Sequence, residues 1–268
     1  MAEIAYTRNS IELDENELWF LLAQFGPGVI VGMGDPYRGW PKDQAALAGE
    51  KGFRSLLQRG ILLPASQHEV FISAQITRAL LACHQAETTL IIQFQESGGS
   101  LVRWFFHFFD NSILEMTELA NSRYQLSFVP SAGQLTEGLR APLRTDSTAM
   151  MHGRPLSLKA NQFDRLRTLC ADGAMDTATE LLLEASLDAE LASTLVADLA
   201  RPVASGAFVA IRSRLKPSAN EVTGFAIMEG SHSIWILEPR GQGRTDEVQL
   251  TPVDPQMVRD RFLKLLPA

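Results

Sequence analysis

The stretch RSLLQRGIL at residues 54–62 recurs without gaps as RTLCADGAM at residues 167–175. Arginine, leucine and glycine match at equal spacing, in the pairs Arg54/Arg167, Leu56/Leu169 and Gly60/Gly173. Each glycine follows an apolar helical pattern, at a position where a left-handed residue commonly ends a helix. We therefore predict a positive φ angle at both glycines. Because a recurring segment indicates a repeated structural unit, the match guides the interpretation of the remaining chain.

A capped helix is expected after each copy of this match. One candidate begins at Ser66, in SQHEVFISAQITRALLAC, where Ser66 and Glu69 have the spacing of a capping box. The other begins at Ser186, in SLDAELASTLVADLA. Apolar residues recur at helical spacing in both segments: Ile72, Ile76 and Leu80 in the first, and Leu191, Leu195 and Leu199 in the second.

Alternating strands follow each of these helices. They are residues 88–95, 101–109, 113–116 and 124–129 in the first copy, and residues 207–215, 221–228, 234–237 and 248–253 in the second. Short connections such as ESGGS and KPSAN are typical of an antiparallel meander. A short helix then closes each copy, over residues 132–139 and 254–266. The sequence therefore predicts an α+β protein made of internally duplicated units, each with helices and an antiparallel meander.

Both faces of the strand at residues 101–109 are apolar. At the strand period of two, Trp104, Phe106 and Phe108 lie on one face, and Phe105, His107 and Phe109 lie on the other. We expect a central strand that is covered on both sides.

The repeat divides the chain into an N-terminal half at residues 1–143, a connector at 144–160 and a C-terminal half at 161–268. The connector contains the proline, serine, threonine and aspartate that are typical of loops. If the halves share one topology, residues 52–140 superpose on residues 163–266 about an approximate two-fold axis.

The segment VIVGMGDPYRGW at residues 29–40 has the composition of a phosphate-binding loop. A dinucleotide loop places its glycines between a strand and a helix that starts at once, within a parallel unit. Here Pro36 and Pro41 delay any helix, and no GK[ST] motif occurs. We interpret the segment as a strand, VIVGM, followed by a turn, and we expect no nucleotide or other cofactor.

No catalytic or metal-binding pattern is evident in the sequence. The five histidines are far apart, without HxxxH or HExxH spacing. Asp146, Ser147 and His152 have the residue types of a hydrolytic triad, but no GxSxG motif accompanies them, and residues so close together rarely align for catalysis. Cys83 and Cys170 lie in apolar helical patterns and are expected to be buried free thiols. We predict no catalytic and no metal-binding residues.

With 46% hydrophobic and 21% charged residues, the 268-residue chain has the composition of an ordinary soluble globular protein. Its net charge of -7 argues against nucleic acid or an anionic membrane as the main partner. The N-terminal segment lacks the basic start and apolar run of a signal peptide, and the longest uncharged run, residues 18–34, is too short to span a bilayer. We expect a cytoplasmic protein without direct membrane insertion, and no oligomeric state follows from the sequence.

The order of these segments resembles the EspG chaperones of type VII secretion. The resemblance rests on ENELWFLLAQFG at residues 15–26, the strand VIVGM, a proline-containing turn, and a helix that closes on Leu56, Arg59, Gly60 and Ile61. Members of that family have a similar ELxxLL start, an LxxRGL-like turn and a second half that echoes the first.

The resemblance implies a quasi-two-fold molecule in which both halves build a central antiparallel sheet, with a helical bundle on either flank. It also implies a non-enzymatic cytosolic chaperone or adaptor that keeps a secreted helical-hairpin protein soluble. The loop ESGGS at residues 96–100 is shorter than the substrate-contacting hairpin of the family, so the recognition surface can differ.

Two loops at equivalent places in the predicted halves are the candidate partner-binding residues: Ser97, Gly98 and Gly99 in one, and Lys216, Ser218 and Asn220 in the other. Polar groups at a rim fix the orientation of a partner around an apolar centre. Since an asymmetric partner seldom contacts two similar ends equally, we expect one of the loops to bind. The alternative function is a small-molecule-binding or enzymatic protein with a pocket between the halves, lined by His107 or His152.

Overall fold

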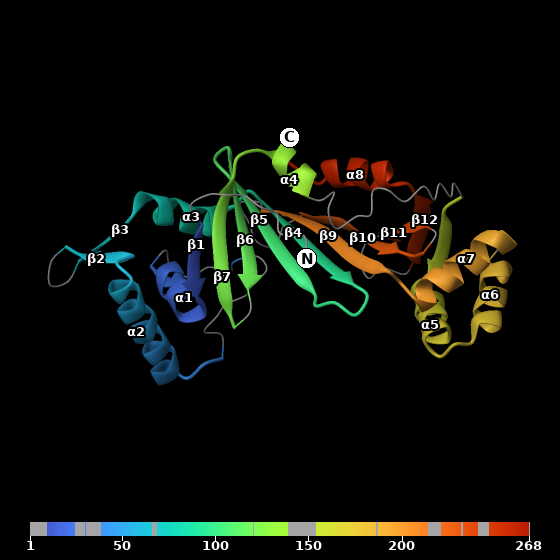
Figure 1. Ribbon diagram of the computed structural model, residues 1–268, viewed down its shortest axis with the longest axis horizontal. Coiled ribbons are helices and arrows are strands. Elements are labelled where there is room, and N and C mark those ends of the chain that lie inside the picture. Colours follow the sequence, from blue (N-terminus) through green and yellow to red (C-terminus); the bar gives the residue numbers. More distant parts are fainter. Residues whose placement is uncertain are drawn as a thin grey trace.

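The computed structural model describes residues 10–24, 30, 39–65, 69–119, 121–138, 154–185, 187–213, 221–231, 233–240 and 247–267. Within these residues, ten strands form one antiparallel sheet in the order β1-β7-β6-β5-β4-β9-β10-β11-β12-β8 (Figure 1). The strands of the first half are β1 (Ile11–Asp14), β4 (Thr88–Glu96), β5 (Val102–Phe109), β6 (Ser112–Leu119) and β7 (Arg123–Val129). Those of the second half are β8 (Leu156–Lys159), β9 (Ala204–Arg212), β10 (Glu221–Glu229), β11 (Ile234–Arg240) and β12 (Glu247–Val253). The predicted α+β class and the two antiparallel meanders are confirmed.

Strands β4 and β9 join the two meanders into one sheet. Both are nine residues long, and they pair antiparallel along their whole length, with Ile92 opposite Phe208 in the middle. On either side of this pair the meander runs outward to an edge strand, β1 or β8, that pairs with the last meander strand. The sheet is therefore built from both halves, as the resemblance implies.

Helices pack at both ends of the sheet (Figure 1). The helices α1 (Glu15–Ala23), α2 (Lys42–Gln58) and α3 (Ala74–Gln85) lie at one end, and α5 (Ala160–Ala171), α6 (Met175–Glu184) and α7 (Ala189–Ala200) lie at the other. Two further helices, α4 (Ala132–Gly138) and α8 (Pro255–Leu263), cover the opposite face of the central strands. Each helical group closes a separate apolar cluster, so the expected flanking helical bundles are confirmed.

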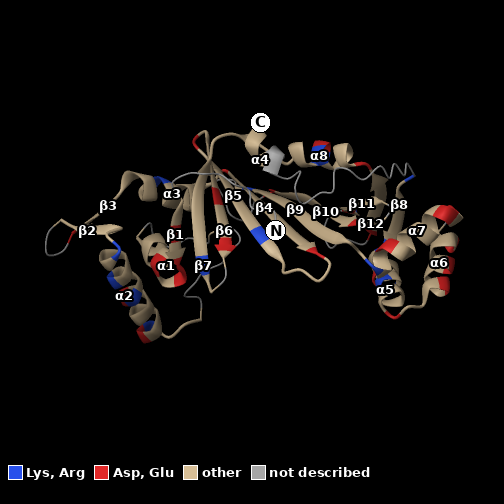
Figure 2. Ribbon diagram, in the orientation of Figure 1, with Lys and Arg blue, Asp and Glu red and all other residues tan. Residues whose placement is uncertain are grey.

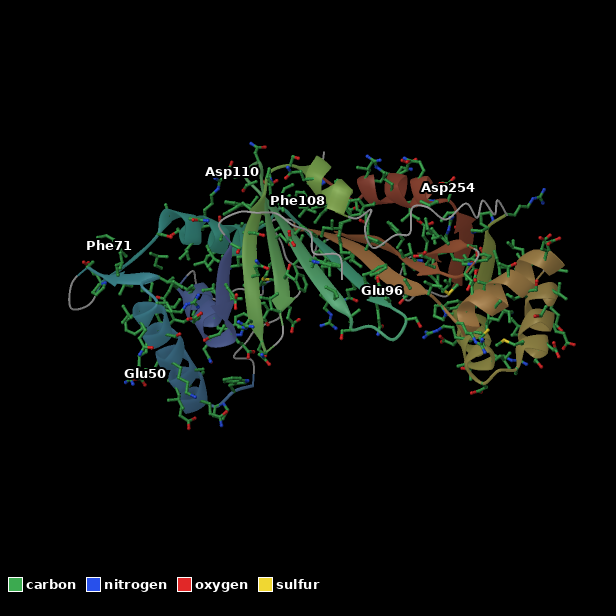
Figure 3. All side chains as sticks on the ribbon, in the orientation of Figure 1. Glu50, Phe71, Glu96, Phe108, Asp110 and Asp254 are labelled. Atoms are coloured by element: carbon green, nitrogen blue, oxygen red, sulfur yellow. The ribbon has the colours of Figure 1, made fainter. Side chains whose placement is uncertain are left out.

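Strand β5 lies inside the sheet and is covered on both faces. Phe106 and Phe108 belong to the apolar cluster under α4 and α8, whereas Phe105 belongs to the cluster under α1 and α3. Figure 3 shows Phe108 near the end of β5, below α4. The prediction of a central strand with two buried faces is correct, because alternating side chains of an interior strand meet a different cluster on each side.

Gly60 and Gly173 end α2 and α5 with φ angles of 67° and 78°. At each end, the amide of the residue after the glycine donates to a carbonyl five residues back: Ile61 to Leu56 at 3.0 Å and Ala174 to Leu169 at 2.9 Å. The glycine amides donate to Leu57 and Cys170. These pairs of bonds define Schellman motifs, and they confirm the predicted positive φ angles.

The predicted start of α3 is wrong. Val70–Ile72 form strand β3, which pairs with β2 (Leu62–Pro64), and α3 begins at Ala74. Its cap is Ser73, whose side chain accepts a hydrogen bond from the amide of Ile76 at 3.3 Å. β-branched and aromatic residues favour a strand where a partner strand is available, so Glu69 precedes a strand and not a helix. Similarly, α7 is capped by Asp188 and not by Ser186, which lies outside the described residues together with Ser66.

The order of elements also changes the interpretation of the repeat. Helices α1 and α5 each follow an edge strand directly, so α5 holds the place of α1 and not that of α2. The ungapped match at Gly60 and Gly173 therefore aligns the end of α2, the second helix of the N-terminal half, with the end of α5, the first helix of the C-terminal half. From α3 and α7 onward, both halves continue with four strands and a short helix. A common origin of the halves, and their superposition, remain predictions.

The predicted connector and the predicted strand VIVGM lie only partly within the described residues. The last residues of the predicted connector form β8 and the first residue of α5, Ala160, and residues 144–153 lie outside the described part. The predicted strand VIVGM also lies outside it except for Ile30, which is buried. Within the described residues, no helix is both long enough and apolar enough to cross a bilayer.

Candidate functional site: a groove beside the C-terminal helices

A groove of about 820 Å³ opens between the C-terminal helices and the centre of the sheet. Phe163 and Arg167 of α5 and Leu199 of α7 form the helical wall, and Ala207 of β9 and Ala226 of β10 lie on the floor. Gln93 and Leu101 line the groove from the N-terminal half. The groove has the size of known ligand and partner pockets and combines an apolar floor with polar groups at its edge.

Small side chains keep the floor of the groove open. The two meanders can be compared through the middle pair of the sheet, Ile92 of β4 and Phe208 of β9. Ile91 precedes Ile92 as Ala207 precedes Phe208, so Ala207 is the counterpart of Ile91. Ile91 pairs with Phe105 and Ala207 pairs with Ala226, so Ala226 is the counterpart of Phe105. In the N-terminal half, Phe105 is buried in the cluster under α1 and α3, and Ile91 packs against that cluster.

The helical wall is held in place by a buried carboxylate. Asp198, at the end of α7, is 1% exposed and accepts hydrogen bonds from the Ser231 amide at 3.0 Å, the Trp235 indole at 3.0 Å and the Ser233 hydroxyl. A side chain at Gly230 would overlap this carboxylate. The end of α7 is thereby fastened to the turn between β10 and β11, which positions Leu199 and Pro202 at the groove.

Polar groups at the edge of the groove have unused hydrogen-bonding capacity. The side chains of Gln93 and Arg167 have no hydrogen-bond or ion-pair partner among the described residues, and the same holds for the carboxylate of Asp164. Outside the groove, α6 and α7 carry acidic residues and no Lys or Arg, whereas α2 carries both signs of charge (Figure 2).

The first predicted partner-binding loop lies beside the groove. Ser97, Gly98 and Gly99 form the turn between β4 and β5, and the Ser97 amide donates to the carbonyl of Val203 at 2.8 Å. Figure 3 shows Glu96, at the start of this turn, on the side of the sheet that faces α5. Leu101, just after the turn, lines the groove. A contact of this loop with a partner remains a prediction.

For the second predicted loop, only the flanking strand ends are described. Lys216, Ser218 and Asn220 lie outside the described residues, but the strand ends that flank them, Arg212 and Glu221, are paired with each other. Arg212 is opposite Thr88, at the end of the β4–β9 pair away from Glu96. Over nine strand residues the two ends are separated by about 27 Å, so Arg212 and Glu221 lie far from the first loop. A contact of the second loop with a partner remains a prediction.

The residues that carry the family resemblance hold α1 against α2. Glu17 is fully buried, forms an ion pair with Arg59 and accepts a hydrogen bond from the Ser55 hydroxyl at 2.6 Å. Glu17 and Asp14 also form a capping box at the start of α1. Arg59 additionally donates to the carbonyl of Glu12 at 2.6 Å. These motifs therefore fasten the N-terminal helices to each other and do not line the groove.

His107 lies buried in β5 and away from the groove. Its Nδ1 atom is 3.1 Å from the hydroxyl oxygen of Thr89, and its Nε2 atom has no partner among the described residues. Burial lowers the pKa of His107 to about 4. The expectation that His107 lines a pocket is not supported by this position, and Asp146, Ser147 and His152 lie outside the described residues.

Both cysteines are buried in helices. Cys83 and Cys170 are free and buried among the described residues, as predicted, and burial raises the pKa of Cys83 to about 12. The described part of the chain contains no group of three or more His, Cys, Asp or Glu residues that could hold a metal ion.

Sequence reasoning missed the floor of the groove and its support. Ala207 and Ala226 are ordinary small residues of alternating strands, and Asp198 occurs in an apolar helix pattern. The signal in the sequence is the small size of Ala207 and Ala226 relative to Ile91 and Phe105.

The fold of the chain is that of a solved secretion chaperone. No protein-family model and no curated protein match the sequence. Among solved structures, the chain is similar to the type VII secretion system chaperone EspG5 of Mycobacterium tuberculosis, determined in complex with the PE25–PPE41 dimer. The TM-score is 0.67 at 13% sequence identity, over 97% of each chain. The resemblance inferred from the sequence is thereby confirmed for the fold.

Proposed function

We propose that this chain is a non-enzymatic cytoplasmic chaperone or adaptor that binds a secreted helical-hairpin protein of the type VII secretion kind. The observation that supports this most strongly is the open groove on a fold shared with EspG5 over 97% of both chains. The structure of EspG5 was determined in complex with a partner dimer, which supports a protein as the partner of this chain as well.

The groove can bind a protein by burying apolar surface and completing hydrogen bonds. Phe163, Leu199 and the alanine floor offer apolar area, which contributes about 25 cal/mol per Å² removed from water before the costs of association. Gln93, Asp164 and Arg167 provide donors and an acceptor around that area. A protein partner with an apolar centre and a polar rim matches this arrangement.

Co-expression with a small helical-hairpin protein encoded beside the gene of this chain tests the proposal. We expect a soluble complex that co-elutes in gel filtration. Leu101→Asp, at the edge of the groove, should abolish co-elution, because it places a charge on the contact surface. Leu47→Asp on α2 is the matched control, since Leu101 and Leu47 are 45% and 53% exposed.

Three results would contradict the proposal. The proteins could elute separately, or both aspartate variants could bind equally well. In addition, a nucleotide or a metal ion could raise the melting temperature while every hairpin protein elutes alone. The last result would favour the alternative of a small-molecule-binding or enzymatic protein.

A further inference from the structure

Strands β2 and β3 form a small separate sheet at the end of the molecule away from α5, α6 and α7 (Figure 1). On one face of this sheet Leu62 is buried, and Ile72 packs against the cluster under α1 and α3. On the other face Leu63 and Phe71 lie opposite each other and are 57% and 67% exposed. Phe71 is the most exposed large apolar side chain of the described residues, and Figure 3 shows it at the far end of the molecule.

The backbone of β3 has an edge that is open to further pairing. The Ala65 amide donates to the carbonyl of Glu69 at 2.9 Å, and hydrogen-bonded pairs alternate with non-bonded pairs along an antiparallel ladder. The amides and carbonyls of Val70 and Ile72 therefore point away from β2. In the described part of the chain these groups have no hydrogen-bond partner. The outer edge of β2, in contrast, carries Pro64, which has no amide to donate.

We propose that β3 pairs antiparallel with β3 of a second copy of this chain, about a two-fold axis at Phe71. In this register Val70 of one copy is opposite Ile72 of the other, and each such pair exchanges hydrogen bonds through the outward groups. The two Phe71 residues form the non-hydrogen-bonded pair between them, where side chains are closest. Leu63 and Phe71 of both copies then form one apolar row across the joined sheet.

Two properties of this end favour a second copy as the occupant. The edge is self-complementary, because a two-fold axis at Phe71 places each outward donor opposite an outward acceptor, as an isologous contact requires. The charges also allow it. Helix α2 carries Lys and Arg beside Asp and Glu, whereas α6 and α7 carry acidic residues and no Lys or Arg (Figure 2). Like charges therefore oppose a contact between two C-terminal ends and not between two N-terminal ends.

The contact is small, because it joins strands of three residues and a single apolar row. Interfaces of this size are below those of permanent dimers, so we expect a dimer that forms reversibly as the protein concentration rises. The groove lies beside the C-terminal helices, so each copy keeps its groove open in the dimer. The inference therefore does not depend on the proposed function.

Sedimentation velocity of the full chain over a wide range of concentrations tests this inference. The unmodified protein should shift from monomer to dimer as the concentration rises. Phe71→Asp should raise the dissociation constant of the dimer about 30-fold or more, since an aromatic anchor contributes about 2 kcal/mol or more. Val222→Asp on β10 is the matched control, because Val222 is a strand residue that is 63% exposed, and it should leave the constant unchanged.

Two further variants test the register of the pairing. Val70→Pro removes an outward amide but no bond to β2, so it should weaken the dimer with little change in melting temperature. Phe71→Cys should form a disulfide between two copies when oxidised glutathione is added, because Cα atoms of a non-hydrogen-bonded pair are about 4.5 Å apart, within the range that a disulfide spans. Val222→Cys is the control for this cross-link and should not form it.

A chain that stays monomeric at every concentration would overturn the inference, and so would a dimer that Phe71→Asp and Val222→Asp weaken equally. Circular dichroism establishes that each variant is folded. If the monomer instead binds a synthetic peptide of alternating Val and Thr, or vesicles of phosphatidylglycerol, in a manner that Phe71→Asp abolishes, the edge serves a different partner and the inference is wrong.

Discussion

In the N-terminal half of the sheet Phe105 and Ile91 close the space under the helices, whereas in the C-terminal half Ala226 and Ala207 leave it open. The strand order and the pairing are the same in both halves. The difference shows that a single framework can close the space under its helices at one end and leave it open at the other, with side-chain size as the variable.

The two helical groups are also anchored differently. Glu17 joins α1 to α2 through Arg59, which is 43% exposed, so that anchor reaches the surface. Asp198 joins α7 to the β10–β11 turn, and two of its partners, Ser233 and Trp235, are buried. The wall of the groove therefore depends on a network whose side chains are buried, which is costly to break.

The largest expected effect is on packing in the closed half. Phe105→Ala should destabilise the protein by about 4 kcal/mol, because it leaves a cavity under α1 and α3. Its mirror substitution, Ala226→Phe, should change stability by less than about 1 kcal/mol, because the ring enters a space that already exists. Urea unfolding of both variants measures these changes, and equal costs would show that the two floors are not counterparts.

The second prediction concerns the anchor of the groove wall. Asp198→Ala should cost about 3 kcal/mol, because it leaves the buried indole of Trp235 and the hydroxyl of Ser233 without an acceptor. Thermal and urea unfolding measure the loss. Glu17→Gln, at the anchor of the other half, is the comparison and should cost less, since Arg59 can turn to water. A larger loss at Glu17 would reverse the proposed ranking.

The third prediction is visible only in acid. The folded pKa of His107, about 4, lies below the unfolded value of 6.5, so the unfolded state binds more protons between these pH values. Stability should therefore fall as the pH drops from 6.5 to 4, by about 3 kcal/mol from this group. The counterpart of His107 is Met228, and His107→Met should remove this part of the pH dependence. If urea unfolding gave the same dependence of stability on pH for His107→Met as for the unmodified protein, this prediction would be wrong.

The smallest effect should be equal in both halves. A Cβ atom added at Gly60 or Gly173 meets nothing within 4 Å, so only the positive φ angle opposes a side chain there. Gly60→Ala and Gly173→Ala should each cost about 1 kcal/mol, because alanine disfavours the left-handed region. Melting temperatures of the two variants should agree closely. A much larger cost at one glycine would indicate a contact specific to that half.

Much of the fold was predictable because its signals are local. The apolar pattern that stops at Gly60 and at Gly173 specifies two helix ends, and alternation on both faces of residues 104–109 specifies an interior strand. The start of α3 was not predictable in the same way. Ser66 with Glu69 and Ser73 are both acceptable caps in isolation, and the pairing of Val70–Ile72 with Leu62–Pro64 decides between them.

The sequence by itself determined the α+β class, the two antiparallel meanders, the positive φ angles of two glycines and the burial of both cysteines, because each depends on neighbours within a few residues. Only the tertiary structure decided that β4 pairs with β9, that Asp198 meets Ser233 and Trp235, and that Ala207 and Ala226 lie together under α5. A small side chain leaves no periodic pattern in the sequence. It leaves a groove only where helices from distant segments lie above it, and the packing of the whole chain sets the position of those helices.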